Sequence, residues 1–135
     1  MPHLKPAVFL DRDGTVIHDA EYLSDPAGVR LMPGAGEAVA RLNRAGIPVV
    51  LVTNQSGIGR GYFTEADFRA VQARLAEVLA AAGARLDAVY YCPHGPDDGC
   101  DCRKPALGLW LRAAREMGLD LERSWYVGDR ARDLA

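Results

Sequence analysis

The feature of this sequence that most constrains its fold is an alternation of short apolar runs with longer segments whose apolar residues recur at helical spacing. The short runs predict four buried strands, at residues 7–10, 47–52, 86–91 and 125–127. The longer segments predict three helices, at residues 33–45, 65–82 and 106–117. Strands that alternate with helices build βαβ units with right-handed crossovers. We therefore expect an α/β fold, with a Rossmann-like parallel sheet and helices on both of its faces.

The chain has 135 residues, the size of one domain, so we expect a single domain over residues 1–135. Its 16 basic and 18 acidic residues give a formal net charge of −2, which excludes a general basic surface for nucleic acid. The longest clearly apolar run, residues 47–52, is far too short to span a membrane, and the first residues lack the apolar stretch of a signal peptide. We expect a cytoplasmic protein whose partner is a small molecule, and neither nucleic acid nor a membrane.

Polar segments follow the predicted strands, and they should gather at one edge of the sheet, because open α/β sheets bind ligands beyond the carboxyl ends of their strands. These segments are residues 11–15 after the first strand, 53–57 after the second and 128–129 after the fourth, with 103–105 before the third helix. Each segment alone is typical of a solvated loop. Together, at the positions where such a sheet has its site, they indicate catalysis.

These residue types suit phosphoryl transfer. The Asp11 carboxylate can attack phosphorus and form an aspartyl-phosphate, and Asp13 can protonate the leaving oxygen and later activate water. Two unit negative charges roughly 4 Å apart repel by about 4 kcal/mol at an effective dielectric constant near 20, so the site needs positive charge. Asp11, Asp13 and Asp129 offer the hard oxygen ligands that suit Mg²⁺, and Lys104 adds a second cation. Thr53 and nearby backbone N–H groups can hold phosphate oxygens.

Three cysteines and a histidine gather within eleven residues, at Cys92, His94, Cys100 and Cys102. A disulfide framework ties distant loops together, whereas three thiolates and one imidazole form a full tetrahedral set for Zn²⁺. The one-residue gaps are tighter than in common zinc fingers, and the alternative is three ordinary thiols in a loop. We expect a structural zinc ion, because a closed site of four ligands leaves no position for a substrate. Such a site would fix Arg103 and Lys104 beside the phosphate.

The order of these motifs resembles the haloacid dehalogenase (HAD) superfamily of phosphatases. The resemblance is carried by Asp-Arg-Asp-Gly-Thr at residues 11–15, by Thr53, by Lys104 and by Gly-Asp-x-x-x-Asp at residues 128–133. Within the superfamily, residues 9–15, 53–58, 92–94 and 100–105 resemble the heptose-bisphosphate phosphatases. The sister family of histidinol-phosphate phosphatases shares the zinc loop, but the stretch Asn-Gln-Ser-Gly-Ile-Gly-Arg-Gly at residues 54–61 favours the heptose enzymes.

The resemblance implies an HAD fold without a large cap domain, and a Mg²⁺-dependent phosphatase that removes the C7 phosphate of D-glycero-D-manno-heptose 1,7-bisphosphate. It implies that Asp11 is the nucleophile and a Mg²⁺ ligand, that Asp13 is the acid/base and binds Mg²⁺ through its backbone carbonyl, and that Asp129 is the third ligand. Thr53 and Lys104 would steady the transferring phosphoryl group.

The resemblance also implies a substrate pocket and one supporting residue. The pocket residues are Asp19, Tyr22, Asn54, Gln55, Ser56, Arg103 and Arg130. Asp133 would support Lys104 or Asp129. His18 matches no functional position, and we expect it on the surface.

The family continues beyond the point where this chain stops, with the rest of a helix and at least one more strand. We therefore expect a fragment, or a partner chain that supplies the missing piece. Without that strand, residues 125–127 form an open apolar edge, which favours swapping or association of this short chain. The full-length parent is expected to be a monomer.

Other functions remain open at this stage. Histidinol phosphate is the alternative substrate. A phosphoacceptor receiver domain also uses Asp, Mg²⁺, Thr and Lys on a parallel sheet, but its phosphorylated Asp typically follows the third strand. A zinc-stabilised interaction domain with an inactive site is the third alternative.

Overall fold

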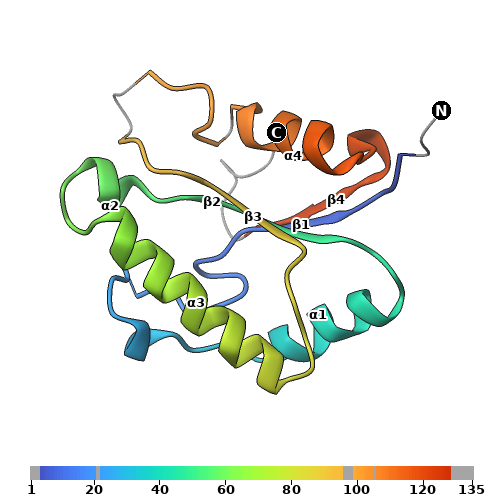
Figure 1. Cartoon of the computed structure of the whole chain (residues 1–135), viewed down its shortest axis with the longest axis horizontal. Helices are drawn as coiled ribbons and strands as arrows, with labels where there is room; N and C mark the ends of the chain where they lie inside the picture. The colour runs from blue at the N-terminus through green and yellow to red at the C-terminus, as the bar shows by residue number, and fades with distance from the viewer. Residues whose placement is uncertain (1–3, 21, 96–98, 105, 129–135) are drawn as a thin grey trace.

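The computed structural model describes residues 4–20, 22–95, 99–104 and 106–128. Its centre is a sheet of four parallel strands in the order β3-β2-β1-β4 (Figure 1). The strands are β1 (Val8–Leu10), β2 (Val49–Asn54), β3 (Ala88–Cys92) and β4 (Trp125–Val127). The predicted parallel α/β sheet is confirmed.

Helices cover both faces of this sheet. Helix α4 (Gly108–Met117) lies on one face, and α1 (Ala35–Arg44) and α3 (Glu65–Ala81) lie on the other (Figure 1). Three short helical segments were not predicted: η1 (Pro26–Gly28), α2 (Ser56–Gly59) and η2 (Leu121–Arg123). Each has only three or four residues, so none of them contains enough turns to produce a periodic apolar pattern in the sequence.

The central strand β2 alternates its side chains between two cores. Val49 and Leu51 pack among residues of α1 and α3, whereas Val50 and Val52 pack among residues of α4. All four side chains are fully buried. Burial on both faces explains why the sequence of this strand is continuously apolar rather than alternating.

Helix α3 begins with a capping box. The Thr64 hydroxyl accepts from the backbone N–H of Asp67, and the Asp67 carboxylate accepts from the backbone N–H of Thr64. These two bonds satisfy backbone donors that a helix start otherwise leaves unpaired.

Strand β2 begins two residues later than predicted and extends through Thr53 and Asn54. Its last residue pairs with Cys92 of β3, and the Gln55 backbone N–H still donates to the Cys92 carbonyl oxygen at 2.7 Å. Pairing with β3 thus carries the backbone past the apolar run and delivers two polar side chains at the end of the strand.

Within the described part of the chain, β4 pairs only with β1. Trp125 and Val127 of this strand are 73% and 49% exposed. In the same part of the chain, no helix is both long enough and apolar enough to cross a membrane.

Candidate active site and metal-binding loop

The carboxyl end of the sheet brings Asp11 and Lys104 into direct contact. Asp11 directly follows β1, and its backbone N–H donates to the Val127 carbonyl oxygen of β4 at 3.0 Å. The Lys104 ammonium donates to Asp11 Oδ1 at 2.9 Å. Both residues are buried, with exposures of 8% and 2%. The two groups lie 93 residues apart in the sequence, and the sheet topology places them at one edge.

Two further acceptors orient the Lys104 ammonium. It donates to the Val52 carbonyl oxygen at 3.1 Å and to the Tyr126 hydroxyl at 2.8 Å. The ammonium has three donors, and these contacts with Asp11, Val52 and Tyr126 supply an acceptor for each. Tyr126 is a neighbour of Lys104 that the sequence analysis missed, because an aromatic residue within an apolar strand gives no sign of its hydroxyl contact.

Asn54 holds the backbone of Lys104. Its Oδ1 accepts from the Lys104 N–H at 2.9 Å, and its Nδ2 donates to the Lys104 carbonyl oxygen at 3.4 Å. The described contacts of this side chain therefore join the end of β2 to the loop before α4. Its expected role in the substrate pocket stays a prediction.

Asp13, Thr53 and Gln55 form a second hydrogen-bonded group. The Gln55 amide Nε2 donates to Asp13 Oδ2 at 3.0 Å and to Thr53 Oγ1 at 2.9 Å. Gln55 is 4% exposed and Thr53 is 1% exposed. The side chain of Gln55 thus links the proposed acid/base to a proposed phosphate-binding hydroxyl.

Arg12 is the residue of this site that the sequence analysis missed most clearly. It is 1% exposed, and its guanidinium forms a two-point contact with the Asp13 carboxylate at 3.2 Å per bond. Charged residues are almost never fully buried unless they are paired. The available signal was its position between two aspartates predicted to be in the site, but the sequence does not reveal whether such a side chain points inward.

The structure also describes the surroundings of three more predicted pocket residues, Asp19, Tyr22 and Ser56. Asp19 is exposed. Tyr22 has a left-handed backbone with a φ of 57° and an edge-to-face ring contact with Tyr62 at 4.8 Å between centroids. Ser56 begins α2, and its Oγ accepts from Arg60 Nε at 3.4 Å. Their roles stay predictions.

Arg103 carries a buried nitrogen without a partner. Among the described residues, its Nη1 is the only buried side-chain nitrogen or oxygen that lacks a hydrogen bond. An unsatisfied buried donor is costly, so native structures seldom leave one without a functional reason. The adjacent Lys104 lies in the site, so this donor is suited to an anionic ligand.

Three predicted residues, Asp129, Arg130 and Asp133, lie outside the described residues. Their expected roles stay predictions. His18, expected on the surface, is exposed.

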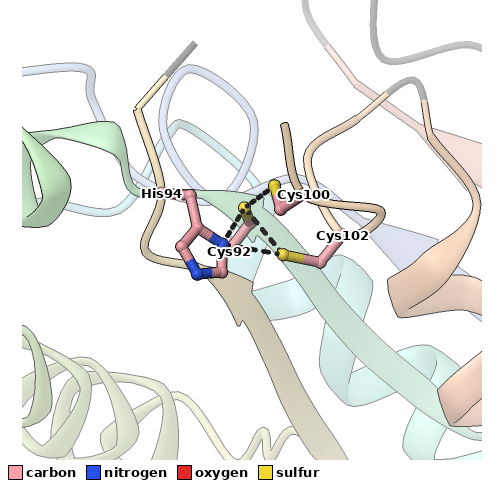
Figure 2. A group of neighbouring side chains, drawn as sticks. All are labelled: Cys92, His94, Cys100 and Cys102. Carbon is pink, nitrogen blue, oxygen red and sulfur yellow. Dashed lines mark hydrogen bonds between the residues drawn. The ribbon is translucent and has the colours of Figure 1, made fainter. Parts of the chain in front are cut away.

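The cysteine-rich loop converges as the sequence predicted. Figure 2 shows the side chains of Cys92, His94, Cys100 and Cys102 pointing toward one another, and their ligand atoms all lie within 4.8 Å. Cys92 Sγ lies 3.5 Å from His94 Nδ1 and 3.4 Å from Cys100 Sγ, and His94 Nδ1 lies 3.2 Å from Cys102 Sγ. Zn–S bonds of about 2.3 Å in a tetrahedron put neighbouring ligand atoms roughly 3.5–3.8 Å apart. The donor set is that of a Zn²⁺ site, and the separations of its atoms, from 2.9 Å between Cys92 Sγ and Cys102 Sγ up to 4.8 Å, lie on both sides of that spacing.

Burial and mutual hydrogen bonding separate the pKa values of the three thiols. Burial, followed by the hydrogen bond to Cys102, raises the pKa of Cys92 far above its usual range. Burial also raises the pKa of Cys102. At Cys100 burial acts in the same direction, but hydrogen bonds from the Cys92 thiol and from backbone N–H groups outweigh it and lower the pKa to about 6. The loop therefore stabilises a thiolate, which is the form that binds a metal.

Relatives of known name match nearly the whole chain. A D-glycero-beta-D-manno-heptose-1,7-bisphosphate 7-phosphatase from Pseudomonas aeruginosa is 45% identical over 128 residues, which cover 94% of this chain and 72% of the relative. A protein of the same name from Mesorhizobium japonicum is 49% identical over 140 residues, with coverages of 98% and 64%. The chain therefore spans slightly less than two thirds of the second relative.

Solved structures match equally well. A crystal structure of D,D-heptose 1.7-bisphosphate phosphatase from B. bronchiseptica, complexed with magnesium and phosphate, has a TM-score of 0.89 and 43% identity, and the match covers 95% of this chain and 72% of that one.

The model of the haloacid dehalogenase-like hydrolase family matches residues 18–135. The chain belongs to the haloacid dehalogenase-like hydrolase family.

Proposed function

We propose that this protein is a Mg²⁺-dependent phosphatase that removes the C7 phosphate of D-glycero-D-manno-heptose 1,7-bisphosphate through an aspartyl-phosphate intermediate. The observation that carries the proposal is the buried contact between Asp11 and Lys104 at the carboxyl end of the sheet. The substrate is inferred from the names of relatives that are 45% and 49% identical to this chain.

In the first step, a carboxylate oxygen of Asp11 forms a bond to phosphorus while the bond from phosphorus to the sugar oxygen breaks. Asp13 donates a proton to that leaving oxygen. In the second step, a water molecule attacks the phosphorus of the aspartyl-phosphate while Asp13 takes a proton from that water. The bond between phosphorus and the Asp11 oxygen breaks and inorganic phosphate leaves. Asp11 is then again a carboxylate and Asp13 is again protonated.

Lys104 supports this chemistry electrostatically. A carboxylate and a phosphate dianion repel each other, and a cation held against the nucleophile offsets part of that repulsion. The ammonium is already oriented by Val52 and Tyr126 before substrate arrives, so little reorganisation is needed during the reaction. The unpartnered Nη1 of Arg103 supplies a further donor for the anionic substrate.

The donor chemistry at this edge fits Mg²⁺. We propose that the Asp11 carboxylate, the Asp13 backbone carbonyl and Asp129 hold the ion, because hard oxygen donors are the ligands that Mg²⁺ prefers. When bound, the ion would neutralise charge that develops on the phosphoryl oxygens.

We also propose that Cys92, His94, Cys100 and Cys102 hold a structural Zn²⁺ ion. The four ligand atoms already lie within 4.8 Å of one another. The last ligand lies directly before Arg103 and Lys104 in the sequence. A zinc ion would therefore fix the backbone that carries two cations of the site, and it would take no part in the reaction.

Phosphate release from a panel of substrates tests the proposal. The panel contains heptose 1,7-bisphosphate, heptose 7-phosphate, heptose 1-phosphate and histidinol phosphate, each assayed with and without Mg²⁺. We expect release from the bisphosphate at the C7 position, with Mg²⁺ required, and no release by the Asp11→Asn variant. Preferential hydrolysis of histidinol phosphate would instead support the alternative substrate, and turnover by Asp11→Asn would exclude Asp11 as nucleophile.

A further inference from the structure

We propose that Arg12 and Gln72 are positioning residues that hold the Asp13 carboxylate in the orientation required for proton transfer. The inference rests on the proposed phosphatase function. It gives a role in positioning to Arg12, in the loop after β1, and to Gln72, on α3.

The Arg12 guanidinium donates a hydrogen bond to each carboxylate oxygen of Asp13. Its Nε donates to Oδ1 and its Nη2 donates to Oδ2, each at 3.2 Å. Two parallel bonds between a planar guanidinium and a carboxylate fix the plane of the carboxylate as well as its position. A single hydrogen bond would leave the carboxylate free to rotate.

Three bonds to Asp13 leave one acceptor site open among the described contacts. A carboxylate has about four lone-pair sites. Arg12 uses one on Oδ1 and one on Oδ2, and Gln55 Nε2 uses the second on Oδ2. The remaining site lies on Oδ1 of a side chain that is 25% exposed. We infer that this site carries the transferred proton.

Helix α3 in turn holds Arg12. Gln72 Oε1 accepts from Arg12 Nη1 at 3.0 Å, and the guanidinium carbon lies 5.3 Å from the centroid of the Phe68 ring. The neighbouring core residues Val71 and Leu75 are fully buried, so the helix cannot shift without disturbing the core. A rigid helix thereby determines where the acid/base group lies.

Stability alone does not account for this arrangement. Removing a guanidinium from water is costly, and buried ion pairs are often no more stabilising than apolar residues of similar volume. Arg12 is nevertheless the largest fully buried side chain among the described residues, and its hydrogen bonds go to Asp13 and to two glutamines, Gln55 and Gln72. Two of these four hydrogen bonds go to the carboxylate of Asp13.

The test compares two substrates that differ in their need for a proton donor. An alkyl sugar phosphate has a poor leaving group that must be protonated, whereas p-nitrophenyl phosphate releases a stable anion. The test variant is Gln72→Met, which keeps the length and helix propensity of the side chain. Arg12→Lys is the second variant, because it keeps the charge but loses the two-point contact. Arg74→Met on the exposed side of α3 is the matched control.

We expect kcat/KM for the sugar phosphate to fall about tenfold in Gln72→Met and about 100-fold in Arg12→Lys, because misplacing a catalytic group by roughly 1 Å can cost about 100-fold. For p-nitrophenyl phosphate we expect a loss of less than about threefold, because Asp13 contributes little there. The control should change neither value. Circular dichroism and the thermal midpoint establish that each variant is folded, and Gln72→Met keeps the test valid if Arg12→Lys does not fold.

Equal losses on both substrates in Gln72→Met would overturn the inference, because they would mean that the contacts serve structure alone. Unchanged activity on both would overturn it as well. If the unaltered protein releases phosphate from neither substrate, the proposed function itself fails. That result is distinct from the pattern that would refute only the positioning role.

Discussion

At the residue scale, the site consists of polar side chains that hold one another in place before any substrate binds. Lys104 makes contacts with Asp11, Val52 and Tyr126, and Asn54 fixes the backbone of the same lysine. Groups that are oriented in advance lose less free energy to reorganisation when charge develops in the transition state. The contacts with Lys104 can therefore be tested one at a time.

Removing the Tyr126 hydroxyl tests the orientation of the ammonium. In Tyr126→Phe, Lys104 loses one acceptor at 2.8 Å and keeps the aromatic ring beside it. A hydrogen bond to a charged group contributes about 1.5–3 kcal/mol. We expect kcat to fall by roughly tenfold or more, with KM changed less, in steady-state phosphate release.

Tyr90→Phe is the matched control. It removes a tyrosine hydroxyl that donates to Glu116 of α4 at 2.7 Å, away from Lys104. This variant should retain normal turnover. Similar rates for Tyr126→Phe and the unaltered protein would argue against an orienting role of Tyr126.

The sequence predicted which polar segments meet better than it predicted their individual contacts. The contact between Asp11 and Lys104 agrees with the expectation that both lie at the carboxyl edge of the parallel sheet. The bond between Arg12 and Gln72 could not be predicted, because 60 residues separate them and only packing of α3 against the sheet brings them together. The sequence also could not predict that the Asn54 side chain points toward the backbone of Lys104.

At the element scale, the loop from β3 to α4 combines a metal-binding cluster with the cations of the site. Cys92 is the last residue of β3, and Lys104 lies four residues before α4. The described residues of this loop, 93–95, 99–104 and 106–107, form no helix or strand, so a four-ligand ion would supply much of its order. The order of this loop is expected to depend on zinc.

His94→Ala tests that dependence, with His18→Ala as the matched control. His94 contributes Nδ1 to the cluster, whereas His18 is exposed and outside it. We expect the unaltered protein and His18→Ala to bind one zinc ion per chain by elemental analysis, and His94→Ala to bind less. Loss of the ion should lower the thermal midpoint by more than about 5 °C. Full zinc content in His94→Ala, or none in the unaltered protein, would refute a four-ligand site.

Strand positions were predicted to within two residues, and the error has a physical cause. The run Ile47 to Val52 is apolar, but the observed strand β2 is Val49–Asn54. Hydrophobicity indicates which residues are buried, whereas the strand ends where hydrogen bonding to β3 ends. An apolar pattern therefore cannot predict the polar end of β2.

At the scale of the whole molecule, hydrophobic cores pack against both faces of the sheet, and hydrogen bonds between polar side chains also join β3 to α4. Tyr90 of β3 donates to Glu116 of α4 at 2.7 Å, and Arg112 donates to the same carboxylate at 3.1 Å. These bonds lower the pKa of Glu116, with the tyrosine as the main cause. Burial and the same contact raise the pKa of Tyr90 to about 12.

Stability should therefore depend on pH through Glu116. A carboxyl group whose pKa is lowered by folding stabilises the folded state above its usual pKa of 4.5, and that contribution is lost as the pH falls through the lowered value. We expect Glu116→Gln to have a lower thermal midpoint than the unaltered protein at about pH 6, and the difference to shrink as the pH falls below 4.5. A difference that stays constant as the pH falls would show that the carboxylate charge is not responsible.

The central claim is that Asp11 becomes phosphorylated during turnover. The most direct measurement is to quench the reacting protein, reduce any acyl phosphate with borohydride, and locate the resulting homoserine by peptide mass spectrometry. We predict homoserine at position 11 in the unaltered protein with substrate and Mg²⁺, and none in Asp11→Asn or without substrate. Steady phosphate release with no reduction at position 11, or with reduction at another carboxylate, would contradict the account.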